Sequence, residues 1–289
     1  MSEQKQRIRG IICIIISAFC FAWMSTFVRL AGDLPSAQKA FFRNLVALVF
    51  ALIMLKKDHI PFKCTNKKNL PALFIRSFLG ALGVLGNFYA VDKLVLSDAS
   101  MLNKMSPFFA VLFSFLFLKE KLTFFQGMTV LTAFIGSLFV IKPSFTDMSS
   151  LPAFAGLAGG IMAGAAYTAV RYAGSRGEKG AFIVAFFSAF STLFFLPFLI
   201  FNFHPMSFKQ VAFMLGAGFA AAGGQFSITA AYTYAPAKEI SVYDYTQLIF
   251  TTAIGAVLFG DHPDIFSIIG YIIIVSTAFV SFRYNRVKA

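Results

Sequence analysis

Charged residues are scarce in this sequence, and their scarcity excludes most soluble folds. Asp, Glu, Lys and Arg make up 13% of the 289 residues, about half of the roughly 25% found in an ordinary soluble domain. Hydrophobic residues make up 58%, and the mean hydropathy is +0.76. A soluble protein of this length could not bury so much apolar surface in one core. We therefore expect the bilayer to be the solvent of this chain.

Residues that build metal and redox sites are also few. Neither metal-ligand spacing nor a disulfide pattern is present among the three cysteines, Cys13, Cys20 and Cys64. Loops hold all three histidines, His59, His204 and His262. A membrane enzyme would need clustered carboxylates or histidines near the membrane surface. We therefore expect no enzyme, no catalytic residues, and neither a metal nor another cofactor.

The basic residues lie in loops rather than on one face. The formal net charge is +13, but its carriers sit in short segments between apolar runs, so we expect no nucleic-acid partner. With the N-terminus in the cytoplasm, seventeen Lys and Arg residues fall in inner segments, five in outer segments and three inside spans, which accounts for all 25. The positive-inside rule then predicts a multi-pass protein of the inner (plasma) membrane with both termini cytoplasmic.

Apolar runs long enough to cross hydrocarbon recur along the whole chain. They cover residues 11–30, 38–55, 71–91, 97–118, 124–141, 152–173, 181–201, 210–235, 240–259 and 265–282. The first run is too long for the apolar core of a signal peptide and is followed by no small-residue cleavage site, so we expect it to be retained. The predicted fold class is an all-α membrane protein with ten transmembrane helices.

The two halves of the chain are similar to each other. Val28–Gly32 ends the first run as Val170–Gly174 ends the sixth, and Leu116–Glu120 has its counterpart in Val257–Asp261. The offsets of 142 and 141 residues are close to half the length. Because each half has an odd number of spans, the second half must enter the membrane from the opposite side. We predict two inverted five-helix repeats, residues 1–145 and 146–289, with a substrate site at their interface.

A similar motif surrounds the end of the fourth span of each half. The first copy comprises Ser106-Pro107, Phe117–Thr123 and Gly136. The second comprises Gln247, Phe259–Asp261 and Gly270. With these residues the whole chain resembles the EamA-like family of the drug/metabolite transporter (DMT) superfamily. The resemblance implies a ten-helix inverted-repeat transporter of small metabolites, often an exporter, and leaves the substrate open. The chain departs from the family pattern at three places. Lys119-Glu120 and Gly260-Asp261 stand where the family usually has a Gly-Glu-like pair, and Thr129 stands where it often has glycine.

Polar side chains at membrane depth are costly, so each is a candidate for function. The fourth span contains Asn103 and Lys104, and the ninth contains Asp244 and Gln247. Lys104 and Asp244 are 140 residues apart and so occupy nearly equivalent places in the two repeats. We expect a central substrate site in which Asp244 meets a cation and Lys104 an anionic group; a structural ion pair that closes the bundle is the alternative. Because the two residues lie toward opposite leaflets, direct contact between them is not assured.

Tyrosines flank this carboxylate. Aromatic faces beside Asp244 would suit an ammonium or sulfonium group. Tyr243 and Tyr245 point about 200° apart on a helix, so we expect one to line the cavity and the other to pack. Tyr232 and Tyr234 of the eighth span are candidates for a second wall.

Further polar residues lie in the second, third and eighth spans. Arg43 either binds a carboxylate or snorkels to the outer headgroups, and we weigh the two equally. For Arg76 we favour snorkelling. Asn87, Tyr89 and Gln225 are weaker candidates, for which interhelical hydrogen bonding is the alternative role. Close helix packing is the main role expected for the small-residue series Gly80, Gly83 and Gly86 and Gly156, Gly160 and Gly164.

These observations favour a secondary transporter that exports a small polar or zwitterionic metabolite, such as an amino acid, across the inner membrane by alternating access. The alternative is a transporter of S-adenosylmethionine or of another nucleoside or organic-cation metabolite. A membrane enzyme, an ion channel and a structural membrane protein are weaker hypotheses. The expected partners are a small-molecule substrate and the lipid bilayer. Proton coupling through Asp244 stays open, as does the choice between a monomer and a dimer.

Overall fold

The computed structural model describes residues 3–94, 96–144, 151–260 and 263–287. The expected repeat boundary at residues 145 and 146 lies outside these ranges, as do Asp261 of the second motif and the loop residue His262. The regular structure within them is helical throughout.

Ten described segments are long and apolar enough to cross a membrane, as the sequence predicts. The first half contains α1 (Glu3–Leu30), α2 (Ser36–Lys57), η1 (Lys67–Asn69), α3 (Leu70–Lys93), α4 (Leu96–Asn103), α5 (Ser106–Leu118) and α6 (Phe124–Ile141). The second half contains α7 (Leu151–Ser175), α8 (Gly180–Phe201), α9 (Phe208–Tyr234), α10 (Ala237–Ile240), η2 (Ser241–Tyr245), α11 (Thr246–Phe259) and α12 (Ile265–Val287). The elements η1, η2 and α10 are short, and each belongs to a longer span.

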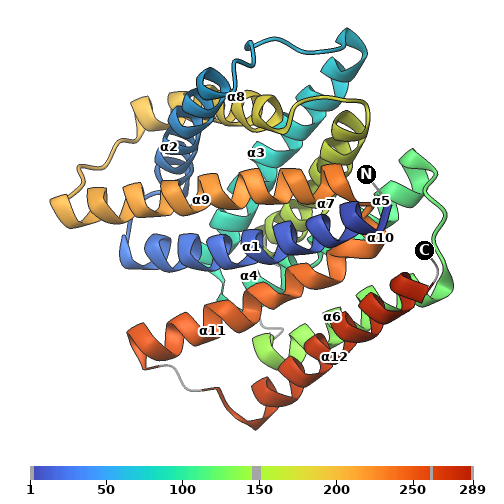
Figure 1. Cartoon of the computed structure of the whole chain (residues 1–289). Coiled ribbons are helices and arrows are strands. Elements are labelled where there is room, and N and C mark those ends of the chain that lie inside the picture. The colour runs from blue at the N-terminus through green and yellow to red at the C-terminus, as the bar shows by residue number, and fades with distance from the viewer. Residues whose placement is uncertain (1–2, 95, 145–150, 261–262, 288–289) are drawn as a thin grey trace.

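The most extensive helix contacts join one half to the other (Figure 1). They pair α1 with α9, α3 with α7, α2 with α8, and α6 with α12. In the repeat, α1 corresponds to α7, α2 to α8, α3 to α9 and α6 to α12. Exchanging the two halves therefore converts the α1–α9 pair into the α3–α7 pair and leaves the α2–α8 and α6–α12 pairs unchanged. A two-fold axis that relates the repeats produces a set of pairs with this symmetry. The pairing and the ten spans confirm the predicted inverted ten-helix fold.

Both chain ends lie at the same end of the bundle (Figure 1). Arg7 near the start of α1 forms an ion pair with Glu239 at 2.6 Å and donates a hydrogen bond to the carbonyl oxygen of Asn285 near the end of α12. An even number of spans places the start and the end of the chain on the same side of the bundle. The loops between the second and third spans and between the sixth and seventh meet at Glu178, which accepts hydrogen bonds from Thr65 and Asn69.

Two spans expected to be continuous helices are broken. The fourth, expected over residues 97–118, divides into α4 and α5 around Lys104, and the ninth, expected over 240–259, passes through the 3₁₀ helix η2. Pro107 lies at the start of α5 and has no N–H to bond the carbonyl of Asn103. Residues 242–245 are β-branched, aromatic or acidic, all weak helix formers. Hydropathy measures apolarity and therefore could not reveal either break.

The outer surface is strongly apolar. Phe201 and Phe208 are each 88% exposed and Val257 is 83% exposed. Such a surface suits lipid contact and would be a liability in water. Within the spans, in contrast, the charged side chains of Arg43, Arg76 and Lys104 are buried.

Candidate functional site

A cavity of about 110 Å³ lies inside the bundle, between the two halves. Its walls come from three of the four inter-half pairs, α1–α9, α3–α7 and α2–α8, and from both broken spans. The polar side chains that line it are Ser25, Arg43, Arg76, Asn87, Asn103, Lys104, Ser106, Tyr167, Gln225, Asp244 and Gln247. The cavity is therefore a polar chamber at the repeat interface.

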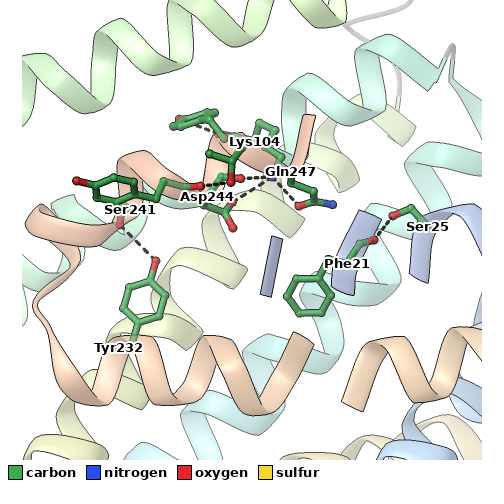
Figure 2. Close-up of polar contacts among 10 residues, drawn as sticks. Phe21, Ser25, Lys104, Tyr232, Ser241, Asp244 and Gln247 are labelled. Carbon is green, nitrogen blue, oxygen red and sulfur yellow. Dashed lines mark hydrogen bonds and ion pairs between the residues drawn. The ribbon is translucent and has the colours of Figure 1, made fainter. Parts of the chain in front are cut away.

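The two helix breaks bring Lys104 and Asp244 into direct contact (Figure 2). The Lys104 ammonium lies 3.1 Å from Asp244 Oδ2 and donates to the Gln247 side-chain oxygen at 2.7 Å. A longer hydrogen bond, at 3.3 Å, reaches the Asp244 carbonyl oxygen. Both charged residues are buried, at 4% and 8% exposure. Lys104 and Asp244 therefore contact each other directly, although their expected positions toward opposite leaflets did not require it.

A second contact holds the two breaks together. The Tyr245 hydroxyl donates to the Lys104 carbonyl oxygen at 3.1 Å. A carbonyl at a helix interruption needs such a partner, because an unpaired polar group is costly at membrane depth. The side chain and the main chain of Lys104 therefore both bind η2.

Arg76 points into the bundle, so the snorkelling favoured from the sequence is wrong. It is 3% exposed, and its Nη2 donates to the Gln225 side-chain oxygen at 2.7 Å. Its guanidinium lies over the Phe187 ring, 4.0 Å from the centroid. Asn87, which matches Gln225 when Gly86-Asn87-Phe88 is aligned with Gly224-Gln225-Phe226, lines the same cavity. An arginine held by a neutral amide and an aromatic face keeps its full charge beside the cavity.

Arg43 also lies inside the bundle rather than at the headgroups. It is 3% exposed and lines the cavity. Its Nε is buried without a hydrogen-bond partner, and no hydrogen bond or ion pair joins its guanidinium to any residue in the part of the chain that the structure describes. The cavity wall thus holds three basic side chains, Arg43, Arg76 and Lys104, against one carboxylate, Asp244.

Four of the eleven candidate residues lie away from the cavity lining: Tyr89, Tyr232, Tyr243 and Tyr245. Tyr243 donates to the carbonyl oxygen of Ala278 at 3.2 Å, so neither it nor Tyr245 faces the cavity as one of them was expected to. Tyr232 stacks on Tyr167 with centroids 5.1 Å apart and bonds Ser241. The remaining candidates, Arg43, Asn87, Asn103, Lys104, Gln225, Asp244 and Gln247, all line the cavity.

Sequence reasoning missed Tyr167, although a signal for it existed. The 142-residue offset between the first and sixth spans maps Ser25 onto Tyr167, and both line the cavity. The same offset maps Phe21 onto Ala163 and Met24 onto Ala166, which are also lining residues. Applying the offset across the whole first span would have selected one face of both helices.

The glycine series serves two purposes. Gly83 and Gly159 face each other where α3 crosses α7, and a Cβ on Gly159 would lie 3.0 Å from the Gly83 carbonyl oxygen. Gly80 instead makes room at the cavity, where a Cβ would meet the Arg76 guanidinium and lie 2.8 Å from the Phe187 ring. Gly83 therefore has the expected packing role, against Gly159, which the series did not include, while Gly80 makes room for the Arg76 side chain.

Comparison with known proteins gives matches along the whole chain. The model of the EamA-like transporter family matches twice, over residues 8–142 and 150–283. The pseudopaline exporter of Pseudomonas aeruginosa is 29% identical over 268 residues, covering 92% of this chain and 93% of its own. The riboflavin transporter of Brucella anthropi is 31% identical over 243 residues, covering 80% and 82%.

Two further matches carry no substrate name. An uncharacterized transporter of Helicobacter pylori is 27% identical over 273 residues, with 92% of each chain covered. A solved crystal structure superposes with a TM-score of 0.83 at 13% identity, covering 97% of this chain and 99% of the other. At that identity the superposition shows the fold alone.

Proposed function

The chain belongs to the EamA-like transporter family of the DMT superfamily, and on this premise we propose that it exports a small polar or zwitterionic metabolite, such as an amino acid or a related compound, across the inner membrane. The observation that carries the proposal is the polar cavity lined by both repeats where two spans are interrupted. Interrupted helices at a repeat interface are a common way for transporters to offer main-chain and side-chain groups to a solute.

The Lys104–Asp244 pair supplies a physical route to alternating access. It joins α4 and α5 of the first half to η2 of the second across the cavity. A zwitterionic solute offers an ammonium to Asp244 and a carboxylate to Lys104, so it competes with the pair for both partners. Binding would then loosen one link between the halves and allow them to rock about the site.

The end of the bundle that holds both termini is closed by polar contacts. Arg171 lies 3.0 Å from Glu120 in an ion pair, Arg7 pairs with Glu239, and Glu178 joins two loops. Burial by itself would raise the pKa of Glu178, but hydrogen bonds from Thr65 and its neighbours outweigh burial and lower it. Under the proposal these contacts form a gate that must open on this side.

The loop charges and one relative support the direction of transport. Seventeen basic residues fall on the side of the termini against five on the other, which favours cytoplasmic termini in an inner membrane. The gate then faces the cytoplasm. Export is the direction in the name of the Pseudomonas relative.

The cavity gives less support to an organic-cation or S-adenosylmethionine transporter. Asp244 is already bound by Lys104, and the flanking Tyr243 and Tyr245 lie away from the cavity lining. The aromatic surround that would favour a sulfonium group is therefore not assembled around this carboxylate.

Proteoliposomes test the proposal. Vesicles containing the purified protein are loaded with a polar metabolite extract, and released solutes are identified by mass spectrometry. We expect selective release with wild type, loss with Lys104→Ala or Asp244→Asn, and retention with Lys142→Ala, whose ion pair with Asp264 is exposed. Release no faster than from protein-free vesicles would contradict transport. Repeating the assay with a pH gradient tests proton coupling.

A further inference from the structure

We propose that Arg43 and Arg76 form an oxyanion subsite in the cavity, and that the transported solute carries a net negative charge, as an acidic amino acid or a small dicarboxylate does. This inference rests on the transport function proposed above and narrows its substrate class. The Lys104–Asp244 pair does not by itself require a solute of net negative charge, because the two charges of the pair cancel.

Arg43 provides the first observation. Its side chain is 97% buried, since only 3% is exposed, and it lines the cavity. Among the described residues it has no hydrogen-bond or ion-pair partner, and its Nε is fully enclosed. A buried charge without a partner is strongly unfavourable, so a protein retains one only where something else binds it. The cavity is where that partner can sit.

Arg76 provides the second observation. Its hydrogen-bond partner, Gln225, is neutral, and the Phe187 ring covers one face of the guanidinium without neutralising it. Its Nε is also buried without a partner. Guanidinium groups offer forked donors that match the two oxygens of a carboxylate. Two such groups on neighbouring helices, α2 and α3, therefore present one donor surface.

The charges of the cavity wall do not balance without a ligand. Asp244 faces Lys104 at 3.1 Å, which leaves the two arginines as an excess of two positive charges. The sequence repeat does not restore the balance of charge. Aligning Phe41-Phe42-Arg43 with Phe186-Phe187-Ser188 places the buried, neutral Ser188 at the position that matches Arg43. A hydroxyl donor, Tyr167, lines the same cavity. A neutral zwitterion would neutralise none of this excess, whereas a solute of net negative charge reduces it.

Matched acid and amide solutes test the subsite. Thermal unfolding of the detergent-purified protein is followed with glutamate against glutamine and with aspartate against asparagine, at high millimolar concentration. The members of each pair have the same shape and differ by one charge. A ligand that binds the folded state raises the unfolding temperature, so we expect each acid to raise it more than its amide.

Arg43→Gln should abolish the acid preference by weakening acid binding about ten- to hundredfold. The matched control is Arg176→Gln, an exposed arginine that stacks on Tyr172 outside the cavity and should leave the preference unchanged. Without solute, Arg43→Gln should unfold at the same temperature as wild type or higher, because an unpaired buried charge is removed. A structural arginine would give a lower temperature.

Gly80→Ala provides a second variant that keeps both arginines. The added methyl group displaces the Arg76 guanidinium and the Phe187 ring, and we expect weaker binding of acids with little change for amides. The subsite is overturned if amides stabilise wild type as well as acids do, if no acid stabilises it, or if the acid preference survives Arg43→Gln. Release of neutral solutes from proteoliposomes alongside any of these results would leave the transport proposal standing and refute the subsite alone.

Discussion

Removing the charge of either Lys104 or Asp244 should destabilise the fold, because the other charge is then left buried without its partner. The Lys104 ammonium makes three contacts, to Asp244 Oδ2, to the Asp244 carbonyl oxygen and to Gln247. Lys104→Met removes all three and leaves a buried carboxylate without its cation, which costs about 3 kcal/mol or more. Asp244→Asn leaves the ammonium with two neutral acceptors but without a counter-charge, so we expect a comparable cost of about 3 kcal/mol or more.

The double variant separates the pair from its surroundings. With Lys104→Met and Asp244→Asn combined, both charges of the pair are gone and neither partner is left uncompensated, so the double variant should be more stable than Lys104→Met alone. Non-additivity on the order of 2 kcal/mol is the expected coupling for residues in direct contact. The measurement is equilibrium unfolding in mixed micelles titrated with SDS, read by circular dichroism.

An exposed ion pair in the same chain serves as the control. Lys142 lies 2.5 Å from Asp264, with side chains 42% and 49% exposed. The hydrogen bond from Lys142, helped by the main chain of Ser267, lowers the pKa of Asp264 to about 2. Exposed pairs nevertheless contribute little to stability, so Lys142→Met should unfold like wild type. Strictly additive costs in the double variant, or single variants at Lys104 and Asp244 that unfold like wild type, would refute the reasoning.

Three further predictions concern other parts of the bundle. Tyr245→Phe leaves the Lys104 carbonyl oxygen without its donor and should cost about 1 kcal/mol in the same unfolding assay; no change would show that another donor replaces the hydroxyl. Gly164→Ala places a Cβ 2.6 Å from a side chain of α5 and should cost about 1–3 kcal/mol, whereas Gly127→Ala, whose nearest neighbour is 3.9 Å away, should cost nothing. The lowered pKa of Glu178 means that its contribution to stability is complete above its ordinary pKa and is lost as the pH falls through the lowered one. Thermal stability of wild type should therefore fall in acid more steeply than that of Glu178→Gln, and parallel profiles would contradict this assignment.

Much of the candidate site could be predicted from the sequence because charge at membrane depth is rare. Lys104, Asp244 and Arg43 are conspicuous in apolar runs, and all three line the cavity. Tyr167 is not conspicuous, since tyrosine is tolerated at many depths, and only the repeat offset to Ser25 identifies it. The direction of Arg76 could not be predicted, because a position one or two turns inside a span allows the side chain to reach either the headgroups or the interior.

The directions of the tyrosines beside Asp244 could not be predicted from the sequence either. The expectation that one of them faces the cavity rested on regular helical geometry. The chain at Tyr243 and Tyr245 is instead a 3₁₀ segment, and the two hydroxyl groups bind main-chain oxygens of α12 and of the fourth-span break. Local backbone form therefore decided which way each ring points.

The sequence by itself determined the ten spans, their inverted duplication and the solvent of the fold, because these depend on the length of apolar runs, the spacing of similar segments and the placement of loop charges. Only the tertiary structure decided that Lys104 meets Asp244, that Arg76 turns inward beside Arg43, and that two spans are interrupted. Such contacts join residues more than a hundred positions apart or depend on where two helices cross. They follow from the packing of both halves around the cavity, which no single segment encodes.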